Sequence, residues 1–176
     1  ARVIAPAGSG KTRTMAARLR HLLDDRGLAP EGIVAVAYNK RAAAELAGRA
    51  GVASTAVRTV HSLGWAILRE GRPGIGLLDE QGQRQILDDL LSINWQANKD
   101  PMAVYLEALN LARLGLESPA SVEASGDDLD GFADCFDDYR RRIYEQGQVD
   151  FTEQIYGAIE VLLRDGQLRQ RWQRRC

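Results

Sequence analysis

The chain has 176 residues, 45% of them hydrophobic and 27% charged, which suffices for a sizeable core in one or two domains. It has neither a run of about 18 uncharged apolar residues nor a recognisable signal peptide, so the sequence predicts no membrane span and favours a cytoplasmic protein. Cys135 and Cys176 have neither metal-binding nor redox spacing, and we expect reduced thiols.

The net charge is −1, but the charges are segregated along the chain. Residues 1–75 carry twelve Lys/Arg and five Asp/Glu. Residues 76–139 carry three Lys/Arg and fourteen Asp/Glu, and residues 140–176 carry eight Lys/Arg and five Asp/Glu. A basic first block suits a polyanion such as a nucleic acid, because neutralising phosphates supplies much of the affinity for it. The alternative is that these charges simply lie on solvated helix faces, and charge alone does not decide between a nucleic-acid-binding surface and such faces.

A glycine-containing loop lies close to the beginning of the chain. Residues 2–5 are a short apolar run that predicts a buried strand, and apolar residues at helical spacing predict a helix over 13–25. Between them runs the sequence Ala5-Pro6-Ala7-Gly8-Ser9-Gly10-Lys11-Thr12. The glycines therefore lie where a strand turns into a helix, which is the context of a phosphate-binding loop.

The chemistry of this loop suits a nucleoside triphosphate. Gly8 and Gly10 can adopt positive φ and approach a ligand closely, and N–H groups at the start of the helix can surround an anion. Lys11 can reach the β- and γ-phosphates, and the Thr12 hydroxyl can bind Mg²⁺. The usual G-x-x-x-x-G-K-[ST] pattern begins with Gly, whereas this chain has Ala5. The alternative is a Gly/Ser turn before a helix that merely carries a lysine.

The next residues alternate between strand and helix patterns. Residues 33–38 predict a strand buried on both faces and residues 55–60 a further strand, with helices over 40–50 and 62–70. Such alternation is typical of an open α/β fold with a parallel sheet and right-handed crossovers.

After residues 71–76 the pattern becomes helical, and we expect no strand until about Gln148. Ser118-Pro119 and Ser125-Gly126 predict turns. Helices are predicted over residues 78–93, 102–114 (starting at Asp100-Pro101), 129–146 (ending at Gly147) and 151–163. The fold prediction is an α/β sheet with an all-helical insertion.

Two strand ends carry residues suited to nucleic acid. The second strand ends in Tyr38-Asn39-Lys40-Arg41 and the third in Thr59-Val60-His61-Ser62. Carboxyl ends of parallel strands form the binding edge of such sheets, so we expect both segments beside the phosphate loop. Aromatic and imidazole rings can stack on bases, and amide, hydroxyl and ammonium groups can hold phosphates. The alternative is that both residues have structural roles. Tyr38 would then cap its strand, and the imidazole of His61 would have its hydrogen bonds satisfied within the protein.

Four segments, 5–13, 35–46, 59–63 and 149–151, carry a family resemblance that extends over nearly the whole chain. In this order they resemble motif I, motif Ia (A-V-T-F-T-N-K-A-A-A-E-M), the T-F-H-G-L/T-F-H-S motif and the V-D-F segment of the UvrD/Rep/PcrA-type superfamily 1 DNA helicases. Ala at the first position of motif I is usual in that family. This chain departs from the family pattern in two places. Asn39-Lys40 falls one residue earlier than the Asn-Lys of motif Ia, which leaves open whether Asn39, Lys40 or Arg41 touches phosphate. Val60 replaces the usual Phe of the third motif.

The resemblance implies a site for each ligand. ATP and Mg²⁺ would bind at Ala5, Pro6, Ala7, Gly8, Ser9, Gly10, Lys11, Thr12 and Arg13, with Lys11 and Thr12 catalytic and Thr12 ligating the metal. Single-stranded DNA would run along Tyr38, Asn39, Lys40, Thr59, His61 and Ser62, with Tyr38 stacked on a base.

The resemblance also implies an architecture and an activity. Residues 1–75 and 149–176 would belong to a RecA-like P-loop NTPase subdomain, 1A, and residues 76–148 to an inserted helical subdomain, 1B. The whole would be an ATP-dependent 3′–5′ DNA helicase or translocase acting on single-stranded DNA or a single/double-strand junction. The Walker B acids are expected beyond Cys176 and a second motor domain in the remainder of the polypeptide, so the fragment alone should hydrolyse little ATP.

Two other functions remain open on the sequence. A P-loop small-molecule kinase would need arginines in a lid over the phosphates, whereas residues 76–139 hold only Arg84, Lys99 and Arg113 as cations. A non-catalytic, helicase-derived DNA-binding remnant would lack the Walker B acids in its parent protein.

Overall fold

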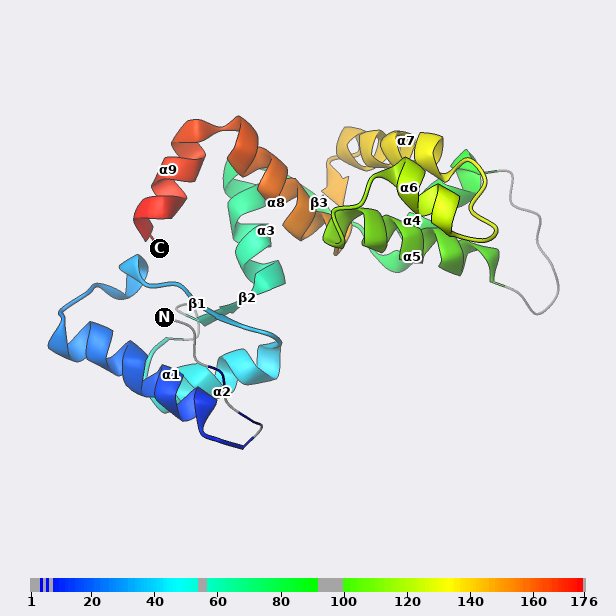
Figure 1. The fold of residues 1–176 in the computed structure, drawn as a ribbon. Coiled ribbons are helices and arrows are strands. Elements are labelled where there is room, and N and C mark those ends of the chain that lie inside the picture. Colours follow the sequence, from blue (N-terminus) through cyan, green and yellow to red (C-terminus); the bar gives the residue numbers. More distant parts are fainter. Residues whose placement is uncertain (1–3, 5, 7, 54–56, 92–99, 176) are drawn as a thin grey trace. The chain divides into compact units, whose positions relative to one another are not determined.

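The computed structural model describes residues 4, 6, 8–53, 57–91 and 100–175 (Figure 1). The chain divides into two compact units, which are described separately. The strand unit comprises Ala1–Leu63 and Leu162–Cys176, and the helical unit comprises Gly64–Val161. Within the described ranges, none of the helices combines the length and the apolar character that a membrane crossing requires.

The strand unit is a small parallel sheet with helices. Its complete elements are α1 (Lys11–Arg20), a π-helical turn (His21–Asp25), a 3₁₀ turn (Pro30–Gly32), β1 (Ala35–Ala37), α2 (Lys40–Ala50), β2 (Val57–Thr59) and α9 (Gly166–Arg175). It also contains the beginning of α3, a helix that spans Val60–Gly71, and the end of α8, a helix that spans Glu153–Arg164. The predicted helices over 13–25 and 40–50 are confirmed, and the predicted strands over 33–38 and 55–60 are present in shorter form. Helix α9 was not predicted.

Strands β1 and β2 pair in parallel, with Ala35 opposite Val57 and Ala37 opposite Thr59. The segments that follow the two strands therefore leave the sheet at the same edge. Helices α1 and α2 bury one face of this pair, in a core that contains Ala16, Leu19, Leu46, Ala47, Ala50, Ala35 and Val57. The prediction that residues 33–38 are buried on both faces is wrong, because Val36, on the opposite side of the pleat, is 36% exposed.

The predicted first strand, residues 2–5, lies outside the described residues except for Ile4. Ile4 belongs to no strand and its side chain is 82% exposed, so the expected burial is wrong at this position. In α1 the buried side chains are Ala16 and Leu19, whereas Met15 is 45% exposed. The buried face of this helix is therefore narrower than its apolar pattern suggests.

The helical unit contains two short strands that the sequence did not reveal. Its elements are most of α3, β3 (Gly76–Leu77), α4 (Glu80–Leu90), α5 (Pro101–Leu114), α6 (Pro119–Ser125), α7 (Phe132–Glu145), β4 (Gln148–Val149) and most of α8. Strand β3 pairs in parallel with β4, so the expectation of no strand before Gln148 is wrong. Two-residue strands carry no periodicity, and the pairing is fixed by long-range hydrogen bonds such as Gly76 N–H to Gly147 O (2.8 Å). The predicted turn at Ser118-Pro119 is instead the capped start of α6.

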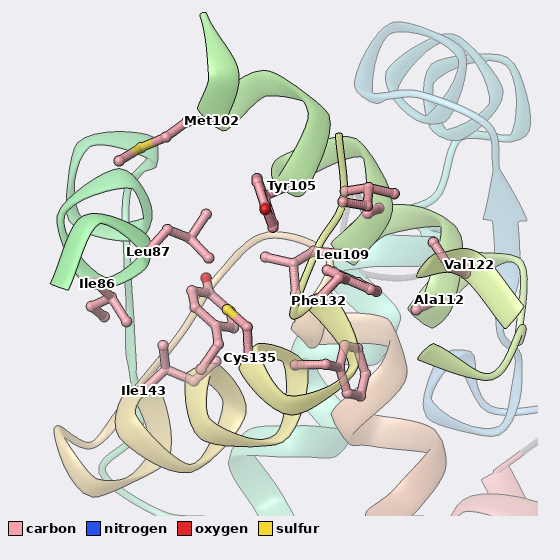
Figure 2. Packing of buried hydrophobic residues seen from close by; sticks show 14 residues of the cluster. Ile86, Leu87, Met102, Tyr105, Leu109, Ala112, Val122, Phe132, Cys135 and Ile143 are labelled. Carbon is pink, nitrogen blue, oxygen red and sulfur yellow. The ribbon is translucent and has the colours of Figure 1, made fainter. Parts of the chain in front are cut away.

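The core of the helical unit is formed by α4, α5, α6 and α7 (Figure 2). Phe132 lies at its centre, with ring centroids 6.0 Å from Phe136 and 6.5 Å from Tyr105. Cys135 belongs to the same cluster, and burial raises the pKa of its thiol to about 11. Because the thiolate is the reactive form, this cysteine is a packing residue.

Gly64 in α3 marks a close approach of two helices in the helical unit. A Cβ at this position would lie 2.5 Å from the backbone oxygen of Gln154 in α8. We expect Gly64→Ala to lower the free energy of unfolding by about 1–3 kcal/mol, because backbone must move to accept the methyl group. Gly48 in α2 is the control, since a Cβ there would have no atom within 4 Å. Gly48→Ala should raise that free energy by up to about 1 kcal/mol. Urea unfolding checks both, and equal effects would contradict this account of the packing.

Candidate nucleotide and nucleic-acid sites

The glycine loop adopts the backbone conformation that the sequence predicted. Gly8 has φ +76° and Gly10, the N-cap of α1, has φ +88°. No atom lies within 4 Å of where a Cβ would stand at either position, so the left-handed conformation, not crowding, is what favours glycine. Helix α1 begins directly after Gly10, and its first N–H groups have no partner within the helix. The loop therefore leads into a helix N-terminus suited to an anion.

The side chains of the loop are gathered around one carbonyl group. Lys11 Nζ donates to Pro6 O over 2.6 Å, and Ser9 Oγ donates to the same oxygen over 2.7 Å. This pairing holds the Lys11 ammonium group over the glycine loop, where it can offset phosphate charge. Thr12 is half-buried and Arg13 is exposed. Ala5 and Ala7 lie outside the described residues.

Tyr38 follows β1 and has a 93% exposed side chain. It is therefore not a core residue, and its open ring is what stacking on a base requires. Lys40 and Arg41, in the first turn of α2, are also exposed. This strand end presents an aromatic ring beside two cations.

Asn39 has a structural role that the sequence analysis missed. It is the N-cap of α2, and its Oδ1 accepts a hydrogen bond from Ala42 N–H at 2.8 Å. The signal was present, since Asn directly before an alanine-rich helix is a favoured cap. Its carboxamide oxygen is thus engaged within the helix.

Thr59 and Ser62 cap the start of α3 reciprocally. Ser62 N–H donates to Thr59 Oγ1 (3.1 Å), Thr59 N–H donates to Ser62 Oγ (2.9 Å), and Ser62 Oγ donates to Thr59 O (3.0 Å). This arrangement resembles a capping box, in which two residues three apart satisfy each other's backbone groups. It fixes the turn that carries His61. Burial lowers the pKa of His61, so its half-buried imidazole is neutral at pH 7.

The structure brings the two predicted strand ends together, because Ala37 and Thr59 are partners in the parallel ladder. Tyr38 and Val60 are the next residues of the two strands and leave the sheet at one edge. Helix α1, which begins at Lys11, packs against α2, which begins at Lys40, two residues after Tyr38. That the phosphate loop lies at the same edge stays a prediction, since the strand expected before it lies mostly outside the described residues.

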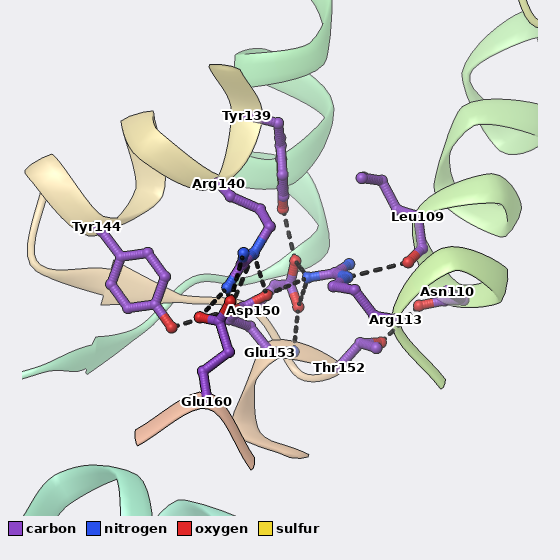
Figure 3. A network of polar contacts seen from close by, with 10 residues as sticks. All are labelled: Leu109, Asn110, Arg113, Tyr139, Arg140, Tyr144, Asp150, Thr152, Glu153 and Glu160. Carbon is purple, nitrogen blue, oxygen red and sulfur yellow. Dashed lines mark hydrogen bonds and ion pairs between the residues drawn. The ribbon is translucent and has the colours of Figure 1, made fainter. Parts of the chain in front are cut away.

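A buried polar network in the helical unit was not predicted (Figure 3). Arg113, 1% exposed, donates through Nη1 to both carboxylate oxygens of Asp150 (2.9 and 2.7 Å) and to Glu153 (3.1 Å). Tyr139 OH donates to Asp150 at 2.7 Å. Asp150 Oδ1 also accepts from Glu153 N–H at 2.8 Å. The aspartate of the V-D-F segment therefore joins α5, α7 and the start of α8.

Glu153 extends this network towards the second arginine. It accepts from Arg140 Nη2 at 2.6 Å and from Tyr144 OH at 2.9 Å, and Arg140 also pairs with Glu160 at 2.7 Å. Burial and the neighbouring carboxylate raise the pKa of Tyr144. Burial would lower the pKa of Arg140, but Glu153 and Glu160 raise it. Two arginines face three carboxylates, and each carboxylate contacts at least one arginine, so none of these ions lacks a partner of opposite charge and the network has a structural role.

Comparisons with known proteins give one consistent result. The family model for the UvrD/REP helicase N-terminal domain matches residues 1–176. The ATP-dependent DNA helicase PcrA of Staphylococcus epidermidis (strain RP62A) is 26% identical over 177 residues, and that of Staphylococcus aureus (strain Mu50) is 27% identical over the same length. Each match covers 92% of this chain and 24% of the relative. The chain thus spans about a quarter of the length of the curated relatives it matches.

Proposed function

Because the chain belongs to the UvrD/REP helicase N-terminal domain family, we propose that it is the ATP-binding part of a DNA helicase or translocase. The intact protein couples ATP hydrolysis to 3′–5′ movement along single-stranded DNA. The observation that carries the proposal is the glycine loop, with Gly8 and Gly10 at positive φ and Lys11 held over it at the start of α1. Residues 1–75 and 149–176 form the RecA-like subdomain 1A, and residues 76–148 form the inserted subdomain 1B.

In this proposal the loop holds the triphosphate of ATP. Catalysis of phosphoryl transfer is mostly positioning and neutralisation of charge. Residues 5–13 surround the phosphates through the backbone N–H groups of every residue except Pro6, which has none, and Lys11 exchanges its bond to Pro6 O for phosphate oxygens. The Thr12 hydroxyl is the group in this loop that would hold Mg²⁺, and the ion would help to neutralise the phosphate charge.

The edge formed by the two strand ends is the proposed track for DNA. The exposed Tyr38 ring stacks on a base and Lys40 contacts a phosphate. Asn39 contributes through its amide NH₂, because its oxygen caps α2. Thr59 and Ser62 hold the turn that lies along the path of the DNA strand. There the neutral His61 ring donates a hydrogen bond to the DNA or stacks on a base.

Movement requires a second motor domain, which we place in the remainder of the same polypeptide. The curated relatives are about four times as long as the stretch matched here. Hydrolysis opens and closes the cleft between the two motor domains, and the Tyr38 and Thr59–Ser62 segments then grip and release the strand alternately. By this account the present chain alone turns ATP over slowly, and the substrate is single-stranded DNA or a junction between single and double strands.

The direct test is ATP hydrolysis by the intact protein with and without single-stranded DNA. Stimulation by DNA, together with directional displacement of a labelled strand, supports the proposal. Equal turnover in the absence of DNA would indicate a small-molecule phosphotransferase instead. Binding of DNA without any turnover would indicate a non-catalytic helicase remnant.

Tyr38→Ala tests the proposed DNA track separately from the nucleotide site. We expect single-stranded DNA to bind about 5- to 150-fold more weakly, which corresponds to a lost stacking energy of about 1–3 kcal/mol. Tyr38→Phe is the matched control, since it keeps the ring and should bind within about twofold of the parent. Fluorescence anisotropy with a labelled oligothymidylate measures both. Unchanged affinity in Tyr38→Ala would show that the strand-end assignment is wrong.

A further inference from the structure

A groove of about 540 Å³ lies within the helical unit, and none of its lining residues belongs to the nucleotide loop. One wall comes from α4 through Glu80, Gln83 and Arg84, which are spaced to share one helix face. The facing wall comes from α5, again through residues three or four apart, and residues 151 and 152 complete the lining. Two helix faces therefore line one depression in the described part of this unit.

The apolar part of the groove includes a large exposed side chain. Phe151 is 60% exposed, and Leu78 and Leu106 beside it are half-buried. Phe151 directly follows Asp150, which is fixed by the buried network, so its backbone is held in place. An exposed aromatic ring on a rigid support, rimmed by polar groups, is characteristic of a binding surface.

The charge of the groove is negative. Its charged lining residues are Asp79, Glu80, Glu107 and Arg84, and Arg84 is already paired with Glu80 (3.0 Å) and Asp100 (2.9 Å). Neither Asp79 nor Glu107 forms an ion pair with any residue in the described ranges. The surrounding stretch, residues 76–139, has three Lys/Arg against fourteen Asp/Glu. This field repels nucleic-acid phosphates and attracts cationic ligands.

We propose that this groove docks a short basic segment of a partner protein. The segment is amphipathic, with an apolar side chain that packs on Phe151 and Leu106 and with Lys or Arg side chains facing Asp79 and Glu107. Apolar anchors in a helical groove supply affinity, and complementary charge supplies specificity and speed of association. The proposal goes beyond helicase activity and does not depend on it, because none of these residues belongs to the ATP or DNA sites proposed above.

The test uses the intact protein and two labelled probe peptides of about 14 residues with the same leucine stripe at helical spacing. One carries Lys and Arg on its polar face and the other carries Glu at the same positions. We expect the basic peptide to bind at least about tenfold more tightly than the acidic peptide and to weaken as NaCl is raised. Glu107→Lys should weaken the basic peptide at least about tenfold, and Phe151→Ala should do the same.

Glu145→Lys is the matched control, since Glu145 is an exposed residue at the end of α7 that does not line the groove. It should change peptide affinity by no more than about twofold. Circular dichroism checks that each variant is folded, and affinity for oligothymidylate should stay the same in all three. Four results would overturn the proposal: equal binding of both peptides, an equal effect of Glu145→Lys, displacement of the peptide by oligothymidylate, or no binding of the basic peptide to the intact protein.

Discussion

Replacing Lys11 by alanine in the intact protein is expected to lower DNA-stimulated ATP turnover by about 100- to 1000-fold. The affinity for single-stranded DNA should stay within about twofold of the parent protein. The physical reason is that the Lys11 ammonium group, held over the glycine loop by Pro6 O at 2.6 Å, offsets phosphate charge during transfer. The strand ends that bind DNA in our proposal do not use this charge. Steady-state ATP hydrolysis and oligothymidylate anisotropy measure the two effects.

The control for this variant lies on the same helix. Arg18 in α1 is exposed and lies two turns beyond the loop, so Arg18→Ala removes one positive charge without touching the site. It should leave turnover and DNA affinity close to those of the parent. If Lys11→Ala kept its turnover, or if Arg18→Ala lost as much, the loop would not be the nucleotide site.

Replacing Arg113 by methionine is expected to lower the free energy of unfolding by about 3–5 kcal/mol. The side chain of Asp150 is 1% exposed and would lose its cationic partner, while Glu153 would keep Arg140. Methionine fills a similar volume, so the loss reports mainly the uncompensated Asp150 charge. Urea unfolding followed by circular dichroism gives the change.

Two further variants separate this effect from a general loss of arginine. Arg142→Met removes an exposed arginine that pairs with Asp89 at 3.2 Å and should cost less than about 1 kcal/mol. Adding Asp150→Asn to Arg113→Met removes the unpaired charge, so the double variant should be more stable than the sum of the single effects predicts. Strict additivity would show that the two residues are not coupled.

The parts of the fold that were predictable from sequence are those with local signals. Helix α2 has the expected bounds because Asn39 caps its start and Gly51, at φ +68°, ends it. Helix α5 starts at Pro101 as the Asp-Pro pair indicated. The glycine loop was recognisable because Gly8 and Gly10 are needed for its backbone conformation.

Most of the parts that were missed depend on partners far away in the chain. The β3–β4 pair joins Gly76 to Gln148, and Arg113 meets Asp150 37 residues later, so no short window contains either interaction. Helix α9 is an exception. Asp165 caps its start by accepting from the N–H groups of Gln167 and Leu168, a local signal that was present in the sequence but was overlooked.

The mutual capping of Thr59 and Ser62 has a consequence for how a strand would be captured. Because each residue satisfies the other's backbone N–H, the first turn of α3 acquires its shape when the chain folds. Binding to such a preformed turn sacrifices little conformational entropy, since the protein side has almost no freedom left to lose. In the motor that we propose, which must grip and let go of DNA at every step, a stiff contact of this kind favours rapid exchange over slow rearrangement.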